Sequence, residues 1–450
     1  MRSLLVSLLL LLSLAAHAQL PDPVLTVKER REVAEAFAKI IDTTYVLPEE
    51  AKKMVAAVRA KIASGAYDGL EPAQALVAQL VKDVRAVNND RHLGLSIAKE
   101  IVPIETEEQR EKRLRPKMIE DAKRSNYGIA KAEKLEGNIG YLDITHFPPA
   151  DVAGPAADAA MAQLAGTDAL IIDARRHRGG DPGMVAHVVS HFVPPGTLIN
   201  TIYSRDKAEP QLFHAAKIAA KPYAKPVYVL TSRQTFSGGE ELASDLQSMG
   251  RGKIYGEVTG GGAHPTGAFR IHERFVALIP SQRSVNPITK TNWEGIGVKP
   301  DVAVPAADAL RAAHVAALQE IAGKTANAER KSELQLLAAR MAPPSDANPR
   351  AALDAWIKSF NEHDQAAREQ WLLANTMYPA EQAKKYAELD NQIRGHHGAF
   401  EIVKVRRTDA LTIEVEAKHA TTGAKARIEI ALDAKQPAKI ADVALEGLAP

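Results

Sequence analysis

The chain has no cysteine among its 450 residues. This absence excludes a disulfide framework, a thiol nucleophile and a lipid anchor attached through an N-terminal cysteine. Stability must therefore come from hydrophobic cores, and a chain of this length has room for two or three of them.

The sequence also lacks an excess of either charge. Lys and Arg number 57 and Asp and Glu number 55, which leaves a formal net charge of +2. A chain so nearly balanced has no electrostatic feature that would attract a polyanion. We therefore expect no nucleic-acid partner.

Long hydrophobic runs are missing everywhere except at the start of the chain. A basic residue, Arg2, precedes an apolar segment at 4–14, and an A-x-A pattern ends at Ala18. These features are typical of a secretory signal peptide, with an apolar run too short to span a bilayer. The sequence predicts cleavage after Ala18, export to the periplasm or the extracellular space, and no membrane span.

Hydrophobic periodicity and turn residues predict the domain organisation. A helical domain follows the signal peptide, and apolar strands alternating with helices indicate a central α/β core with crossover connections. A long alanine-rich helix, from about 306 to 342, is expected to leave that core, and Pro343-Pro344-Ser345-Asp346 indicates a linker. The predicted segments are a signal peptide (1–18), an N-terminal helical domain (19–87), the core (88–305), a helix and linker (306–347), and a C-terminal α+β domain (348–450).

Ser237 is the strongest candidate nucleophile in the core. It follows the β-branched strand 226–231 and precedes a predicted helix that begins near Gly238. A helix N-terminus presents unpaired amides and a positive dipole, both of which favour a developing anion. The alternative is a simple capping box, because Ser237 and Glu240 have the S-x-x-E spacing. The pair Gly238-Gly239 favours the nucleophile, since glycine is a poor choice for starting a helix.

Three further features supply partners for a serine nucleophile. His92 lies in the polar loop that leaves the N-terminal helices, although from its position alone it could be an ordinary loop residue. Glu294 lies in a late glycine-flanked loop, and Gly179-Gly180 forms a turn after the strand 169–174. A nucleophile, a base, an orienting acid and backbone amide donors are the parts that acyl transfer requires.

Four motifs, in this order, resemble the tail-specific, or C-terminal processing, serine peptidases, specifically the branch with tricorn protease and the interphotoreceptor retinoid-binding protein modules. The resemblance covers about residues 25 to 305. It implies a crotonase/ClpP-like α/β core. The motifs are Asp90-Arg91-His92-Leu93, Asp173-Ala174-Arg175 through Gly179-Gly180, Thr235-Phe236-Ser237-Gly238-Gly239-Glu240, and Glu294-Gly295-Ile296-Gly297-Val298-Lys299-Pro300-Asp301.

The resemblance implies a role for each matching residue. Ser237 would be the nucleophile, His92 the general base and Glu294 the residue that orients the base. Gly238 and Gly180 would supply the two amides of the oxyanion hole. No cofactor and no metal are implied, and the substrate would be a peptide or an unfolded protein; the sequence carries no indication of an oligomeric state.

The chain departs from the family pattern in four places. The best-known branch uses a Ser-Lys dyad, but the stretch 256–262 contains no lysine, which favours a histidine base. Arg91 stands where tricorn protease has a serine, and His177 replaces the asparagine of the glycine turn. The segment between His92 and residue 138 is too short and too charged for a PDZ domain.

Two other predictions complete the sequence analysis. His187 and His191 have the spacing of a helical metal-binding pair, but Val188 stands where a metalloprotease needs its glutamate, so no metal site is expected. The C-terminal domain resembles the NTF2-like or cystatin-like accessory domains of secreted hydrolases.

The sequence and the resemblance together favour a secreted serine peptidase that forms an acyl-enzyme on Ser237. The alternative is a non-catalytic protein that binds an apolar ligand on the same fold, as retinoid-binding members of the branch do. The pKa of His92 is expected near 6.5, raised somewhat by Glu294.

Overall fold

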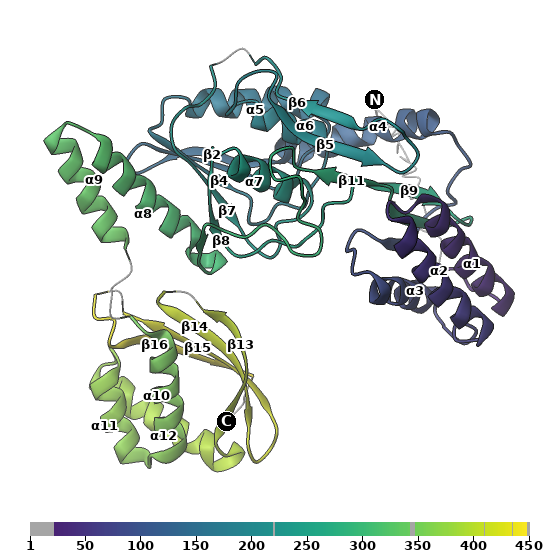
Figure 1. Ribbon diagram of the computed structural model, residues 1–450. Coiled ribbons are helices and arrows are strands. Elements are labelled where there is room, and N and C mark those ends of the chain that lie inside the picture. The colour runs from purple at the N-terminus through teal and green to yellow at the C-terminus, as the bar shows by residue number, and fades with distance from the viewer. Residues whose placement is uncertain (1–21, 219–220, 343–346, 409, 434, 448–450) are drawn as a thin grey trace, which may run out of the picture. The chain divides into compact units, whose positions relative to one another are not determined.

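A computed structural model describes residues 22–218, 221–342, 347–408, 410–433 and 435–447 (Figure 1). The predicted signal peptide and the linker 343–346 lie outside the described residues. In the part that is described, no helix is long and apolar enough to cross a membrane. The described residues divide into two compact units, of which the first comprises 22–119, 200–213 and 261–295, and the second comprises the other described residues.

The first unit begins with the three predicted helices. They are α1 (Val27–Thr44), α2 (Pro48–Ala63) and α3 (Ala73–Val87). Apolar side chains at helical spacing, including Phe37, Ile41, Met54 and Leu80, are fully buried in one core. The charged helix α4 (Glu107–Arg124) follows in sequence, as predicted.

Antiparallel strands complete the first unit. Strands β1 (Gly94–Ile97), β10 (Phe275–Pro280) and β9 (Thr266–Arg270) form one sheet, in which Leu95 pairs with Ala277. Leu95 and Phe275 join the core of the three helices, so the sheet and the helices share one hydrophobic core. A second small sheet has the order β11 (Gln282–Val285), β5 (Leu198–Ser204), β6 (Gln211–His214).

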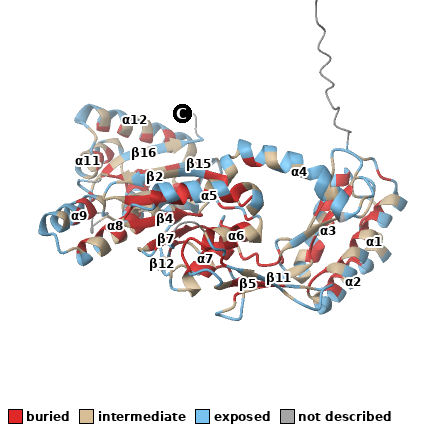
Figure 2. Cartoon of the chain, turned by 90° about the horizontal axis from the view of Figure 1, so that it is seen from above, coloured by how far each residue is buried: buried red, intermediate tan, exposed pale blue. Residues whose placement is uncertain are grey.

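A six-stranded sheet forms the centre of the second unit. Its order is β12 (Val302–Ala303), β8 (Lys253–Gly256), β7 (Val227–Thr231), β4 (Ala169–Asp173), β3 (Ile139–Ile144), β2 (Ile129–Leu135). All neighbours are parallel except β2 and β3, which are antiparallel. Every residue of β3, β4 and β7 is buried, as expected for parallel strands covered on both faces (Figure 2).

Three helices of the second unit cover one face of this sheet. The crossovers β3–α5–β4, β4–α6–β7 and β7–α7–β8 all proceed in one direction across the sheet, so right-handed connections place their helices on one face. These helices are α5 (Ala150–Leu164), α6 (Pro182–Val189) and α7 (Gly238–Ser248). The predicted α/β core is confirmed.

The alanine-rich segment after the core differs from its prediction. Instead of one helix from 306 to 342, the chain forms α8 (Ala306–Lys324) and α9 (Ala328–Met341), a hairpin visible in Figure 1. The first helix ends at Lys324, with Thr325 as its C-cap, and Asn327 caps the start of the second, because its side chain accepts the N–H of Arg330 at 2.9 Å. The segment does not leave the core: Ala313 and Ala317 are fully buried with the strand residues Ile171 and Leu230.

The C-terminal domain is α+β, as predicted. Its helices are α10 (Pro349–Glu362), α11 (Gln365–Asn375) and α12 (Ala380–His397), and its antiparallel sheet has the order β13 (Phe400–Thr408), β14 (Thr412–His419), β15 (Lys425–Leu432), β16 (Ile440–Glu446). Alternate residues of β14 and β15, such as Val415 and Ile428, are buried against Trp356 and Phe360.

Candidate active site

Ser237 occupies the turn between β7 and α7, as the sequence predicted. Its backbone has φ 54° and ψ −121°, a region that residues with a Cβ rarely adopt. Such strain persists only where surrounding contacts enforce it, and it is typical of nucleophile turns between a strand and a helix. Ser237 is therefore held in a conformation that a simple helix cap does not require.

Three hydrogen bonds fix this turn to neighbouring loops. The Thr235 hydroxyl donates to the carbonyl oxygen of Ala174 at 2.8 Å. The N–H of Phe236 donates to the carbonyl oxygen of His177 at 3.0 Å. The N–H of Gly260 donates to the carbonyl oxygen of Thr235 at 2.9 Å. These hydrogen bonds hold the strained backbone of Ser237 in place.

The glutamate of the S-x-x-E pair is also part of the support. Glu240 is fully buried, and its Oε2 accepts the N–H of Ser237 at 2.8 Å. Its Oε1 accepts a hydrogen bond from the hydroxyl of Thr259, whose oxygen in turn accepts the N–H of Val298 at 2.7 Å. Glu240 thus makes its half of the capping box while anchoring the serine to two later loops.

The glycine turn lies directly against Ser237. Gly179 and Gly180 have φ 103° and 138°, and a Cβ added to Gly179 would lie 2.7 Å from Cβ and 3.2 Å from Oγ of Ser237. A Cβ on Gly238 would lie 3.3 Å from the nitrogen of Gly180. Only glycine permits this close approach.

The geometry places the two predicted oxyanion donors together. Among the hydrogen bonds of the described residues, neither the Gly180 amide nor the Gly238 amide donates to a protein acceptor. Two backbone amides that converge beside a serine hydroxyl can bind the oxygen of a tetrahedral intermediate. The structure therefore keeps available the two amides that the resemblance implied.

His177 supports the glycine turn through a hydrogen bond to its backbone. Its Nδ1 accepts the N–H of Gly179 at 3.0 Å, so the neutral ring carries its proton on Nε2. A Cβ on Gly239 would lie 2.6 Å from Nδ1, and the Phe147 ring centroid lies 4.3 Å from that of the imidazole. Burial lowers the pKa of His177 to about 3, which keeps the ring neutral and Nδ1 available as an acceptor.

The predicted base and its orienting residue lie together in the first unit. His92, Glu294 and Asp90 each place one side-chain nitrogen or oxygen within 4.8 Å of those of the other two. The N–H of His92 donates to Oδ1 of Asp90 at 2.9 Å, and Nδ1 of His92 lies 3.9 Å from the same oxygen. Glu294 lies more than 200 positions after Asp90 and His92 in the sequence, so tertiary structure alone brings it to them.

Sequence analysis missed two members of this cluster. Nδ1 of His264 lies 2.7 Å from Oδ2 of Asp90 and 3.6 Å from Oε2 of Glu294, while the Tyr45 hydroxyl donates to Asp90 at 3.0 Å. Oε2 of Glu294 also accepts the N–H of Ala263 at 2.6 Å. The available signal for His264 was its position just after the glycine-rich turn 260–262 and before a proline.

Electrostatics in the cluster differ from the sequence expectation. Burial lowers the pKa of His92 to about 4, and the charge of Asp90 offsets only part of that effect. The expected pKa near 6.5, raised by Glu294, was wrong because burial outweighs the charge of Asp90. Burial alone would raise the pKa of Asp90, but its hydrogen bond to His264 lowers it below the ordinary value. At neutral pH, His92 is therefore uncharged and able to accept a proton.

The candidate residues can also be compared by exposure, by donor type and by the unit to which they belong. Lys253, the nearest lysine in sequence that could serve as a base, is exposed at the start of β8. The trio Asp90, His92 and Glu294 also offers the donor types of a metal site. Ser237, Gly180 and Gly238 belong to the second unit, and His92 and Glu294 to the first.

Comparison with known proteins identifies the family. Residues 138–304 match peptidase family S41, and residues 23–132 match the N-terminal domain of Peptidase_S41 in eukaryotic IRBP. Together the two matches cover more than half of the chain. The chain belongs to peptidase family S41.

Solved structures with a similar fold include several proteases. A protein from Parabacteroides merdae has 20% identity and a TM-score of 0.45, over 61% of this chain and 90% of that one. The photosystem II D1 C-terminal processing protease has 16% identity and a TM-score of 0.39, over 62% and 93%. Tricorn protease has 13% identity and a TM-score of 0.39, over 70% and 37%.

Proposed function

We propose that this S41 family member is an exported serine peptidase that cleaves peptides or unfolded proteins through an acyl-enzyme on Ser237. The observation that carries the proposal is the strained Ser237 beside the free amides of Gly180 and Gly238. A hydroxyl at this position, with two donors ready for an oxyanion, suits acyl transfer. The leader pattern that ends at Ala18 supports export.

In the proposed reaction, Oγ of Ser237 attacks the carbonyl carbon of the scissile peptide bond. His92 accepts the hydroxyl proton, and the amides of Gly180 and Gly238 stabilise the negative oxygen of the tetrahedral intermediate. When the C–N bond breaks, His92 returns the proton to the leaving amine. A water molecule, deprotonated by the same imidazole, then hydrolyses the ester and regenerates the serine.

Asp90 and Glu294 would act on His92 by orientation and charge. A carboxylate near the imidazole favours the productive tautomer and stabilises the imidazolium that forms during the reaction. The contact of His264 with both carboxylates keeps these acids in place. In this proposal His264 is a positioning residue.

Labelling with a serine-reactive phosphonate, followed by peptide mapping, tests the nucleophile directly. We expect one modified peptide, containing Ser237, and no labelling or peptide cleavage by the Ser237→Ala variant. The free energy of unfolding of that variant should lie within about 1–2 kcal/mol of the wild-type value, because only a cap-type hydroxyl is removed. Labelling at another serine would reject the proposal, and a folded wild type without labelling or turnover would favour the alternative of an apolar-ligand binding protein.

A further inference from the structure

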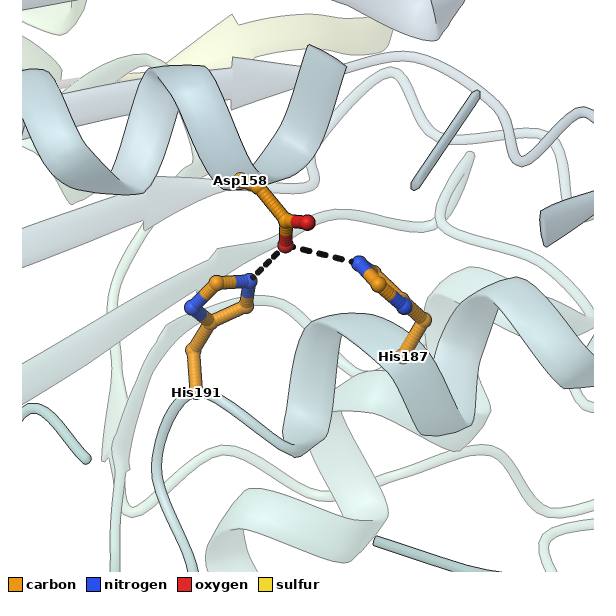
Figure 3. A group of neighbouring side chains, drawn as sticks. All are labelled: Asp158, His187 and His191. Carbon is orange, nitrogen blue, oxygen red and sulfur yellow. Dashed lines mark hydrogen bonds and ion pairs between the residues drawn. The ribbon is translucent and has the colours of Figure 1, made fainter. Parts of the chain in front are cut away.

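Two histidines and one aspartate meet on the α5–α6 side of the second unit, among residues that the proposed peptidase reaction does not use. Figure 3 shows Asp158 on α5 pointing toward His187 and His191, which come from α6 and the turn just after it. Oδ1 of Asp158 lies 2.8 Å from Nε2 of His187 and 2.9 Å from Nε2 of His191. Three side chains of the donor types that bind zinc therefore converge on one point.

The geometry of the three atoms is close to that of a metal site. Tetrahedral coordination with bonds of 2.0–2.1 Å separates neighbouring ligand atoms by about 3.3 Å. The observed separations of 2.8 and 2.9 Å need to widen by only a few tenths of an ångström to admit an ion. Both histidines direct Nε2 at the carboxylate, so one nitrogen of each ring is already aimed at the shared position.

The surrounding helices support this arrangement in two ways. Gly154 lies one turn before Asp158 on α5, and a Cβ there would lie 3.2 Å from Cε1 and Nε2 of His187, so glycine makes room for the ring. The two rings lie at the C-terminal end of α6, where the helix dipole favours a cation.

The cluster is accessible to an ion and to a further ligand. The Asp158 side chain is 49% exposed, whereas that of His191 is 5% exposed, so the site has one open and one buried side. Asp158 and His191 also line a pocket of about 720 Å³, together with Met161, Lys221, Tyr223 and Lys225. The pocket gives an ion with three protein ligands space for a fourth, exchangeable one.

We propose that Asp158, His187 and His191 form a binding site for a divalent transition metal, with Zn²⁺ as the ion that the donor set fits best. The site consists of two imidazole nitrogens and one carboxylate oxygen, with water or an anion from the pocket as the fourth ligand. The sequence alone predicted no metal here, because Val188 stands where the metalloprotease motif needs a glutamate. The third ligand comes from another helix, 29 positions before His187.

Metal titration of the full chain tests this site, provided that the Asp90–His92–Glu294 trio cannot contribute. All variants are therefore made in a His92→Ala background, stripped with a chelator and titrated with Zn²⁺ by calorimetry. We expect one zinc per chain in His92→Ala and an affinity at least about tenfold weaker after Asp158→Asn or His187→Asn, since even outer-shell partners contribute 10- to 100-fold. The matched control, Asp151→Asn, changes an exposed carboxylate in the first turn of α5 and should bind like the background.

Two further measurements locate the ion. Zinc should raise the melting temperature of the His92→Ala background and of the control, but not that of the two ligand variants. Crystals soaked with Zn²⁺ should show an anomalous peak between the three side chains. The proposal is overturned if the affinity of His187→Asn equals that of the background, or if zinc is bound only by proteins that retain His92. Neither result would bear on Ser237, so this test is separate from that of the peptidase proposal.

Discussion

Nδ1 of His177 accepts the backbone N–H of Gly179 at 3.0 Å, and this hydrogen bond joins a fully buried imidazole to the turn that touches Ser237. This hydrogen bond fixes the peptide plane before Gly179. The N–H of Phe147, which donates to the carbonyl oxygen of Gly179 at 2.9 Å, fixes the next plane, and that plane carries the amide of Gly180. In the family pattern this position is an asparagine. An asparagine side chain also carries an oxygen that can accept a hydrogen bond, so both residue types can supply an acceptor to the glycine turn.

A matched pair of substitutions tests whether that acceptor is required. His177→Asn keeps an acceptor and should retain kcat/KM within about tenfold, whereas His177→Leu fills the space without an acceptor. Loss of one oxyanion donor costs about 10²–10³ in kcat, so we expect a fall of that order for His177→Leu. Steady-state kinetics on a peptide substrate, with circular dichroism to confirm folding, provide the comparison. Equal activity of the two variants would show that the imidazole only fills space.

The same residue should make stability depend on pH. The folded-state pKa of His177 is about 3, below its ordinary value near 6.5, so the unfolded chain binds one more proton between these values. The contribution of neutral His177 to the free energy of unfolding is complete above pH ~6.5. It is lost as the pH falls, at about 1.4 kcal/mol per pH unit. In urea unfolding between pH 4 and 6, the free energy of unfolding of His177→Asn should depend less steeply on pH than that of wild type, by about 1.4 kcal/mol per pH unit. An unchanged slope would mean that the buried ring is protonated in the folded protein.

Gly179 provides a second test of the close contact with Ser237. In Gly179→Ala the new Cβ would lie 2.7 Å from Cβ of Ser237 at a φ of 103°, so the turn must shift. We expect a loss of about 1–2 kcal/mol in stability, from the unfavourable φ, and a marked fall in kcat. Gly166→Ala is the control, because a Cβ there meets no atom within 4 Å. The kinetics and the unfolding curve of Gly166→Ala should match those of wild type. If those of Gly179→Ala also match, the glycine turn is not placed as described.

The identity of the base can be read from the pH profile. His92 must be neutral to accept a proton, and its pKa is lowered to about 4, so kcat/KM should rise with pH around 4 to 5 and then level. His92→Ala should abolish this rise, the acidic limb of the pH profile, together with most of the activity. Glu294→Gln should reduce kcat by about 10²- to 10⁴-fold, by analogy with triad aspartates.

His264 supplies the control for that assignment. As a positioning residue that contacts Asp90 and Glu294, it should tolerate His264→Asn better than His92 tolerates alanine, and the variant should keep an acidic limb. A near-normal rate for His92→Ala, with activity lost in His264→Asn, would transfer the role of the base to His264. A limb at pH 7 or above that is insensitive to both changes would indicate a lysine base.

The sequence by itself determined the local features of this protein. Apolar residues at helical spacing predicted the three N-terminal helices, and continuous apolar runs predicted the buried strands β3, β4 and β7. The strand, serine and paired glycines predicted the nucleophile turn, since only a few residue types tolerate such a backbone. Strands β2, β5, β6 and β11 were not predicted, because polar residues interrupt their apolar ones and leave no continuous apolar run.

Only the tertiary structure decided which distant residues meet. The segments 200–213 and 261–295 join the N-terminal helices in one unit, and this long-range pairing brings Glu294 and His264 to Asp90 and His92. Asp158 reaches the histidine pair only because crossover connections place α5 and α6 on one face of the sheet. The pKa of His92 likewise follows from burial, which depends on contacts from several segments. Sequence spacing describes neighbours along the chain, whereas these contacts and their electrostatic effects arise from the packing of separate elements.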